Sequence, residues 1–116
     1  MESNPERNIG RNIERFLIVY RGAPAGSPDA ADHQPPRWTA WFDTLGARVV
    51  DRGSLTHASV EIHTRLAGPT SSASALSGYC IVEAADFNEA VKLAELCPVF
   101  DEHGSVEVAR LTAAPG

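Results

Sequence analysis

One stretch of this chain constrains its fold more than any other, because residues 77–110 contain a complete strand–helix–strand unit. The run from Tyr79 to Ala84 combines aromatic, β-branched and small residues, which predicts a largely buried strand. Asp86 offers a helix N-cap, and Glu89, three residues later, supplies the second half of a capping box. The sequence therefore predicts that a helix begins directly after this strand.

The end of this unit is marked as clearly as its beginning. Cys97-Pro98 ends the helix, because proline cannot continue it, and Gly104 turns the chain into a second strand, Val106–Val108. The apolar positions of the helix recur at helical spacing: Phe87, Ala90, Val91 and Ala94. The boundaries of all three elements can thus be placed from local residue types.

The first third of the chain predicts a similar pair of elements. The run from Arg15 to Tyr20 is apolar on both faces, which favours a central strand of a sheet. Residues 21–36 are rich in glycine and proline and predict a long loop of the kind that is usually functional or mobile. Pro36 then suits the first turn of a helix, and Gly46 its end. The helix carries one apolar stripe: Trp38, Trp41, Phe42 and Leu45.

Two further strands are predicted in the middle of the chain. Residues 47–53 form the first. Residues 58–66 form the second, because apolar and polar side chains alternate strictly along them. Ala58, Val60, Ile62, Thr64 and Leu66 lie on one face, and Ser59, Glu61, His63 and Arg65 lie on the other. Residues 67–77, with Gly68-Pro69 and a Ser/Ala tract, predict a flexible crossing.

This order of elements predicts an α+β fold with a ferredoxin-like βαββαβ core, an extra strand and an antiparallel sheet. Two helices can cover only one face of such a sheet. The other face must be hydrated or buried by a partner, and a second copy there makes a homodimer with a dimeric α+β barrel. We expect one domain over residues 15–111, with a flexible N-terminal tail at 1–14 and a short C-terminal tail at 112–116.

Composition excludes several classes of partner. A net charge of −5 and an isoelectric point near 5.2 argue against nucleic acid or an anionic membrane as partner. The longest apolar stretch, Phe16–Tyr20, is too short to span a bilayer, and the polar N-terminal residues do not resemble a signal peptide. Cys80 and Cys97 make no disulfide framework, so we expect reduced, buried thiols in a cytoplasmic protein.

The polar face of the 58–66 strand is the strongest candidate for chemistry. Glu61, His63 and Arg65 project the same way at neighbouring positions of that face. If the face lines a cavity between subunits, His63 can act as a general base, Glu61 can orient it, and Arg65 can hold an anionic substrate. The alternative is an exposed antiparallel strand that alternates polar and apolar residues only because one face meets solvent.

Other residues carry weaker signals. Trp38 and Tyr79 are candidate ligand-binding residues, although a tryptophan in a helix stripe and a tyrosine opening a central strand are more often part of the core. His57 and His63 lack a clear third ligand, and Asp101-Glu102-His103 precedes Gly104 in what we expect to be a solvated turn. We therefore predict no metal site, and nothing in the sequence calls for a cofactor.

Short motifs along the chain resemble those of the YCII-related, or DGPF, family. They are Trp38-x-x-Trp41-Phe42, Leu45-Gly46, Asp51-x-Gly53, Gly68-Pro69, Ser77-Gly78-Tyr79, Glu83-Ala84-x-Asp86, Glu89-Ala90 and Cys97-Pro98 leading into Gly104-Ser105-Val106-Glu107-Val108. The resemblance covers roughly residues 15–111 and is most specific in the final third. It implies a small bacterial protein with a dimeric α+β barrel fold. Most of that family has no known function, a few members act on small aromatic or lactone-like compounds, and others are encoded beside sigma factors.

The chain departs from the family pattern in one loop. Where the motif reads Asp-Gly-Pro-Phe, this chain has Ala67-Gly68-Pro69-Thr70, so the acid is missing, and the charged segment that follows it is replaced by Ser71–Ala75. Some family members use a His–Asp pair proposed as catalytic, and His33, ahead of the first helix, lies near the position of that histidine. By the same resemblance, His33 and Asp51, in the Asp51-x-Gly53 motif, are candidate ligand-binding residues.

Two functions from different classes follow from these residues. The first is a cofactor-independent enzyme that performs acid–base chemistry, such as isomerisation, elimination or ring opening, on a small anionic or aromatic molecule. The second is a non-catalytic module that binds a ligand or a protein partner. The placement of His63 and Tyr79 discriminates between them, because a closed pocket favours catalysis and an open, hydrated face favours binding alone.

Overall fold

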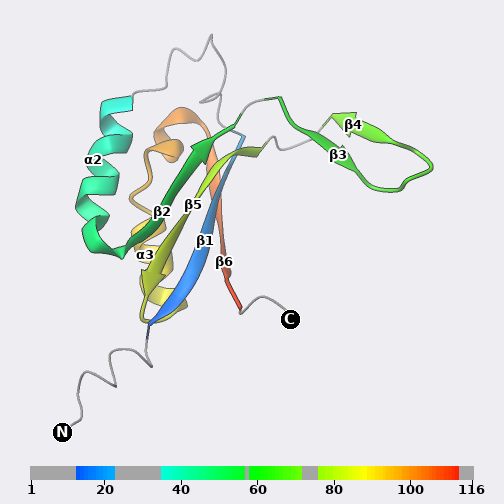
Figure 1. Ribbon diagram of the computed structural model, residues 1–116. Coiled ribbons are helices and arrows are strands. Elements are labelled where there is room, and N and C mark those ends of the chain that lie inside the picture. Colours follow the sequence, from blue (N-terminus) through cyan, green and yellow to red (C-terminus); the bar gives the residue numbers. More distant parts are fainter. Residues whose placement is uncertain (1–12, 23–34, 57, 72–75, 113–116) are drawn as a thin grey trace, which may run out of the picture.

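The computed structural model describes residues 13–22, 35–56, 58–71 and 76–112, and within them it contains helices and antiparallel sheets, as predicted for an α+β protein (Figure 1). The elements in chain order are β1 (Glu14–Arg21), α2 (Pro35–Leu45), the 3-10 helix η2 (Gly46–Arg48), β2 (Val49–Leu55), β3 (Val60–Ile62), β4 (Pro69–Ser71), β5 (Leu76–Ala84), α3 (Phe87–Ala94), the 3-10 helix η3 (Pro98–Glu102) and β6 (Ser105–Arg110). The predicted tails fall almost entirely outside the described residues.

The main sheet has four strands in the order β2-β5-β1-β6, and each neighbouring pair is antiparallel. Strand β1 lies between β5 and β6, which confirms the central position predicted from its two apolar faces. In the β1–β5 register Ile18 faces Cys80 and Leu17 faces Ile81. Because side chains alternate along a strand, the first pair lies on one face of the sheet and the second pair on the other.

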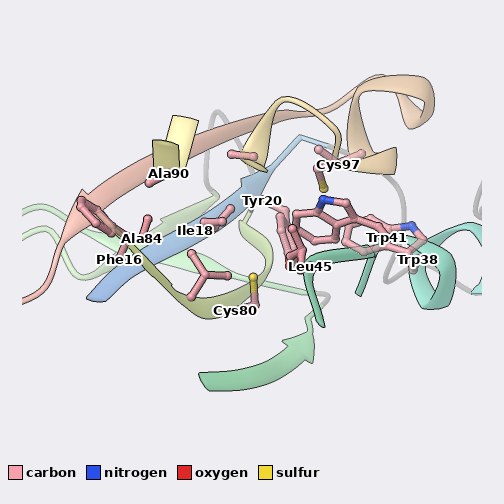
Figure 2. Packing of buried hydrophobic residues seen from close by; sticks show 13 residues of the cluster. Phe16, Ile18, Tyr20, Trp38, Trp41, Leu45, Cys80, Ala84, Ala90 and Cys97 are labelled. Atoms are coloured by element: carbon pink, nitrogen blue, oxygen red, sulfur yellow. The ribbon is translucent and has the colours of Figure 1, made fainter. Parts of the chain in front are cut away.

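The core lies on the sheet face that both helices cover (Figure 2). Apolar residues on one face of β1 and β5 pack there against the stripe of α2 and the two small residues of α3, and the next turn of chain adds two more side chains. The members are Phe16, Ile18, Tyr20, Trp38, Trp41, Leu45, Cys80, Val82, Ala84, Ala90, Ala94, Cys97 and Val99. The predicted apolar stripe of α2 is therefore core, with Phe42 half-buried at its margin.

Local signals set the ends of both helices largely as predicted. Gly46, directly after α2, has φ +60°, the left-handed conformation that glycine adopts most readily. At the start of α3 the Asp86 carboxylate accepts a 2.9 Å hydrogen bond from the Glu89 backbone N–H. The Glu89 carboxylate accepts a 2.8 Å bond from the Ala85 N–H, so the capping box closes one residue before the N-cap.

Helix α3 ends earlier than its predicted stop. Its last residue is Ala94, and Cys97 follows as the N-cap of η3, with Pro98 in the first turn of that 3-10 helix. Proline fits there because it needs no N–H in the first turn of a helix. Pro98 thus starts a new helical turn instead of only ending the old one.

The predicted strand over residues 58–66 is wrong in length and in place. Only Val60–Ile62 is a strand, and it pairs with β4 in a separate two-stranded sheet outside the main one. Ala58 has φ +60°, which breaks the extended run before it. Thr64 ends it, because its side-chain oxygen accepts a 3.0 Å hydrogen bond from the Ala67 N–H and closes a turn. Strand β4, within the predicted flexible crossing, was missed.

Candidate functional site

A cavity of about 210 Å³ lies between α2 and β2 and is the candidate site of this protein. The side chains that line it come from β1, α2 and β2: Tyr20, Trp38, Phe42, Arg52, Gly53, Ser54 and Leu55. Tyr20 and Trp38 are buried and form its floor, whereas Arg52, Ser54 and Leu55 are exposed and form its rim. The cavity is therefore apolar at the bottom and open at a cationic edge.

The floor of the cavity is aromatic. Trp38 and Phe42 stand one helical turn apart on α2, so both side chains face β2. The Tyr20 ring meets the Trp38 indole edge-to-face, with ring centroids 4.8 Å apart and planes at 72°. Such edge-to-face pairs fix ring orientation beyond what burial alone provides. The floor is thus a preformed apolar surface, of the kind that receives a flat ligand.

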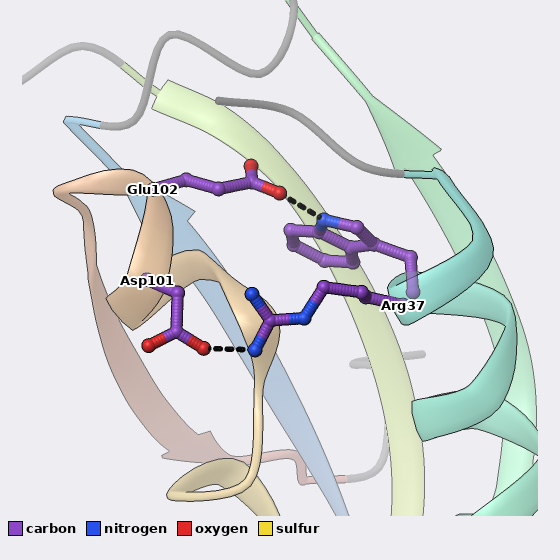
Figure 3. Close-up of polar contacts among 4 residues, drawn as sticks. Arg37, Asp101 and Glu102 are labelled. Carbon is purple, nitrogen blue, oxygen red and sulfur yellow. Dashed lines mark hydrogen bonds and ion pairs between the residues drawn. The ribbon is translucent and has the colours of Figure 1, made fainter. Parts of the chain in front are cut away.

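The position of Trp38 is fixed by a buried carboxylate (Figure 3). Its indole Nε1 donates a 2.8 Å hydrogen bond to Glu102 Oε2, and Glu102 is only 1% exposed. On the same helix, the Arg37 guanidinium donates to the Asp101 carboxylate, which is exposed. The prediction of a solvated turn at residues 101–103 is therefore wrong for Glu102, although Asp101 and His103 are exposed.

The rim of the cavity carries one cation, Arg52. Its guanidinium lies over the Phe42 ring, 5.1 Å from the centroid, and 3.6 Å from an Asp43 carboxylate oxygen. The side chains of this ion pair are 58% and 70% exposed, so the pairing is weak. A guanidinium has five N–H donors, so Arg52 can also donate to an anion above the ring floor.

The path of β2 beside the cavity depends on Asp51 and Gly53. The Asp51 carboxylate accepts a 2.8 Å hydrogen bond from the Gly53 N–H, and Gly53 has φ +65°. A Cβ at Gly53 would lie 1.9 Å from the Tyr79 carbonyl oxygen, so only glycine fits. The register of β2 against β5 shifts just before Asp51 and again between Asp51 and Ser54, across this turn. The Asp51-x-Gly53 motif thus bends β2 at Arg52, and Asp51 serves the turn instead of lining the cavity.

Three polar or nucleophilic groups are buried beneath the cavity. The Tyr20 hydroxyl is closed off from solvent and has no hydrogen bond of ordinary geometry with any described residue, although it lies near the Cys80 thiol. Burial, together with that thiol, raises the pKa of Tyr20 well above its usual value. Burial likewise raises the pKa of Cys80 to about 11 and that of Cys97 to about 12. These groups are neutral and inert at physiological pH.

A second, more open groove of about 370 Å³ lies between α2 and the segment that joins α3 to η3. Its lining consists of Arg37, Ala40, Trp41, Thr44, Leu96 and Pro98. The one charged side chain of this lining, Arg37, is paired with Asp101. Trp41 is held at its base by a 3.1 Å hydrogen bond from its Nε1 to the Leu93 carbonyl oxygen. Since its charge is already paired, this groove is a weaker candidate than the α2/β2 cavity.

The predicted catalytic residues lie away from both hollows. His63 and Arg65 are exposed on the β3–β4 hairpin, and they line neither the cavity nor the groove. His63 Nε2 is 3.1 Å from Glu61 Oε1, with the two side chains 73% and 41% exposed. The structure therefore brings the predicted base and carboxylate together. Their predicted place in a cavity between two subunits concerns a second copy of the chain and stays a prediction.

The predicted ligand-binding residues are scattered. Trp38 lines the α2/β2 cavity from within the core. Tyr79 is half-buried on the opposite face of the sheet, where it pairs with Val19. Asp51 is exposed and bonded to the β2 turn. His33 lies outside the described residues. Of these four, the described structure thus places Trp38 alone at a cavity.

Sequence reasoning missed one residue that lines the candidate cavity, Arg52, and one that supports it from outside, Glu102. Glu102 carries no local signal of burial, because its partner Trp38 lies 64 residues away in the chain. Arg52 had a usable signal, since it stands between the residues of the Asp51-x-Gly53 motif. A left-handed glycine after an aspartate indicates a bend in a strand, and such bends re-aim side chains.

Within the described residues, no group of three or more His, Cys, Asp or Glu side chains is arranged to hold a metal ion. No helix among them is long and apolar enough to cross a membrane. Comparisons of the chain with protein-family models, with curated proteins and with solved structures found no match, so membership of the YCII-related family stays a prediction from the sequence motifs.

Proposed function

We propose that this protein binds a small molecule with one aromatic ring and an acidic group in the α2/β2 cavity. The observation that carries the proposal is the pairing of an aromatic floor, Tyr20 and Trp38, with a single guanidinium, Arg52, at the rim. The floor would receive the ring, and Arg52 would donate to the acid. Of the two functions that the sequence suggests, this is the ligand-binding one. We propose it for a member of the YCII-related family.

The size of the cavity supports a ligand with a single ring. An engineered cavity of about 150 Å³ in another protein holds one benzene molecule. The volume of about 210 Å³ between α2 and β2 therefore suits one ring with a short substituent. Larger ligands of drug size occupy pockets of about 300–1,000 Å³. The rings on the floor offer edges and faces at fixed angles, which favour a flat guest.

The proposal is tested by calorimetric titration with benzoate, phenylacetate and the neutral analogue benzyl alcohol. We expect the two acids to bind more tightly than the alcohol. Arg52→Gln should weaken acid binding by about tenfold or more, because it removes a charge-assisted hydrogen bond. Arg48→Gln is the matched control, since Arg48 pairs with Glu89 away from the cavity. Failure of all three probes to bind, or equal effects of the two variants, would contradict the proposal.

We further propose that the protein is a homodimer of the dimeric α+β barrel type. The strand order β2-β5-β1-β6, with β3 and β4 set aside, supports a ferredoxin-like core, because that fold has the same order and connections. The face of the sheet opposite the helices carries a patch of half-buried aliphatic and aromatic side chains, which supports its burial by a second copy. The patch consists of Leu17, Val19, Tyr79 and Ile81. Analytical ultracentrifugation tests this directly, and a monomer at micromolar concentration would exclude it.

The second candidate function is cofactor-independent acid–base catalysis. The contact between His63 and Glu61, 3.1 Å long, supports it, because a carboxylate beside an imidazole orients the base. His63→Ala should then leave the fold and the assembly intact while abolishing turnover of a small anionic or aromatic substrate. His103→Ala, on the η3 turn, is the control. A His63→Ala variant that binds every accepted ligand and behaves as the parent protein would leave ligand binding as the function.

A further inference from the structure

The β3–β4 hairpin stands apart from the rest of the described structure. Its two strands pair with each other and not with the four-stranded sheet, and it extends away from both helices (Figure 1). Val60, Glu61 and Ile62 face Ser71, Thr70 and Pro69, and each strand is three residues long. A two-stranded hairpin of this length is marginally stable at best in water. We call residues 58–71 the arm.

The arm exposes the apolar side chains that a strand normally buries. Val60 is 64% exposed and Ile62 is 66% exposed, and both lie on the same side of β3 because they are two residues apart. Leu66, in the turn that follows, is 99% exposed. The opposite side of β3 carries Glu61, close to His63. The arm therefore has one apolar side and one polar side, but no core beneath it.

We infer that the arm of each protomer packs its apolar side, Val60 and Ile62, onto the open sheet face of a second copy. This inference rests on the proposed homodimer and adds to it the segment that each subunit lends the other. The receiving surface, here called the open face, consists of Leu17, Val19, Tyr79 and Ile81. In a two-fold dimer each chain supplies one arm and one open face. The arm-to-face contact therefore occurs twice, once in each direction.

The area of the sheet favours this arrangement over contact between two sheets alone. The strands β1, β2, β5 and β6 are 8, 7, 9 and 6 residues long, so at about 4.8 Å between strands and about 3.3 Å per residue they present a projected face of only about 500 Å². A stable dimer buries about 800 Å² on each partner. The arm lies outside that face and carries the three most exposed large apolar side chains among the described residues, Leu66, Ile62 and Val60. Burial of the arm supplies much of the area that the sheet face lacks for a stable dimer.

The charges around the two surfaces are compatible with this contact. The edge of the open face carries two ion pairs, Arg15–Glu83 at 3.7 Å and Arg21–Glu107 at 3.4 Å, so both signs are present there. The arm likewise carries both signs, with Glu61 on the polar side of β3 and Arg65 exposed in the turn that follows. With its apolar side on the patch, the arm keeps these groups in solvent at the rim, as interfaces commonly do.

The first test is sedimentation equilibrium of the full chain and of two variants. Val60→Ser/Ile62→Ser should weaken dimerisation by at least about a hundredfold, because two arms each lose two buried aliphatic side chains. Leu96→Ser is the matched control, since Leu96 is 59% exposed on the helix side of the protein. The arm packs outside the core, so the far-ultraviolet circular dichroism of the arm variant should match that of the parent protein.

A complementation experiment identifies what the arm touches. A face variant, Val19→Thr/Ile81→Thr, should dimerise as weakly as the arm variant. In an equimolar mixture, the intact arm of the face variant meets the intact face of the arm variant, so the heterodimer should form more tightly than either homodimer. If the mixture gains nothing, or the arm variant and the control weaken dimerisation equally, the inference is overturned while the homodimer stands. A monomeric parent protein overturns both.

Discussion

The indole Nε1 of Trp38 donates a 2.8 Å hydrogen bond to the carboxylate of Glu102, which is buried and lies 64 residues further along the chain. This bond ties α2 to η3 and thereby fixes the floor of the candidate cavity. The exposed ion pair between Arg37 and Asp101 joins the same two elements. The position of the ligand site therefore depends on a side chain outside the site.

We expect Glu102→Ala to lower the free energy of unfolding by about 1–3 kcal/mol, because it leaves the buried indole N–H without its acceptor. Glu102→Gln keeps an acceptor oxygen and should cost less. The measurement is urea denaturation followed by tryptophan fluorescence. Asp101→Ala serves as the control, since the exposed ion pair of Asp101 with Arg37 is worth at most about 1 kcal/mol. Equal losses for Glu102→Ala and Asp101→Ala would contradict this account.

Trp41→Ala should destabilise the protein by about 3–5 kcal/mol or prevent folding, because it empties the middle of the α2 stripe. Trp41 is 4% exposed, and its Nε1 donates to the Leu93 carbonyl oxygen, so the substitution also removes one of the hydrogen bonds to that carbonyl, which keeps the Leu96 N–H as a donor. Thermal melts of Trp41→Ala and Trp41→Phe separate the two contributions. A shift of only a degree or two for Trp41→Ala would show that the ring is not part of the core.

Tyr20→Phe should leave the free energy of unfolding unchanged or raise it by up to about 1 kcal/mol. The hydroxyl is buried and makes no hydrogen bond of ordinary geometry with a described residue, so its removal relieves a desolvation cost. The ring, which packs on Trp38 and Trp41, is kept. A loss of more than about 1 kcal/mol in urea denaturation would mean that the hydroxyl is hydrogen-bonded in solution.

The two buried thiols should make the protein less stable in alkali. The pKa of Cys80 is raised to about 11 and that of Cys97 to about 12, because burial disfavours the thiolate. Below pH 9 the thiols carry their protons in both states, and their contribution is fully present. Above pH 9 the unfolded chain loses these protons while the native protein keeps them, so stability falls by up to about 1.4 kcal/mol per pH unit for each thiol.

Denaturation curves at pH 7, 8.5, 9.5 and 10 would measure this slope, and they are recorded in the Tyr20→Phe background because the raised pKa of Tyr20 would add its own loss near pH 10. The Cys80→Ala/Cys97→Ala variant should flatten the profile between pH 9 and 10, whatever its overall stability. A slope that persists in this variant would assign the alkaline loss to other groups. At pH 8 the native thiols should also resist alkylation until urea unfolds the chain, because both are buried.

The sequence by itself determined the elements whose boundaries depend on neighbouring residues. The Asp86 and Glu89 cap, the left-handed Gly46 and the apolar stripe of α2 are local features, since hydrogen bonds and side-chain spacing within one or two turns produce them. The two apolar faces of β1 likewise predicted its central place in the sheet, because continuous apolar runs are typical of central strands and edge strands more often carry polar residues on one face.

Tertiary structure alone decided the features that join distant parts of the chain. The alternation over residues 58–66 predicted a full strand, but the backbone at Ala58 and the turn at Thr64 limit it to Val60–Ile62. This short strand pairs with β4 and not with the main sheet. Glu102 is buried because it lies opposite Trp38, which donates a hydrogen bond to it. No residue near Glu102 in the sequence indicates this partner. The α2/β2 cavity forms because α2 and β2 pack side by side in the folded chain. The pattern of residue types predicts secondary structure through its periodicity, but it does not show which elements will pack together.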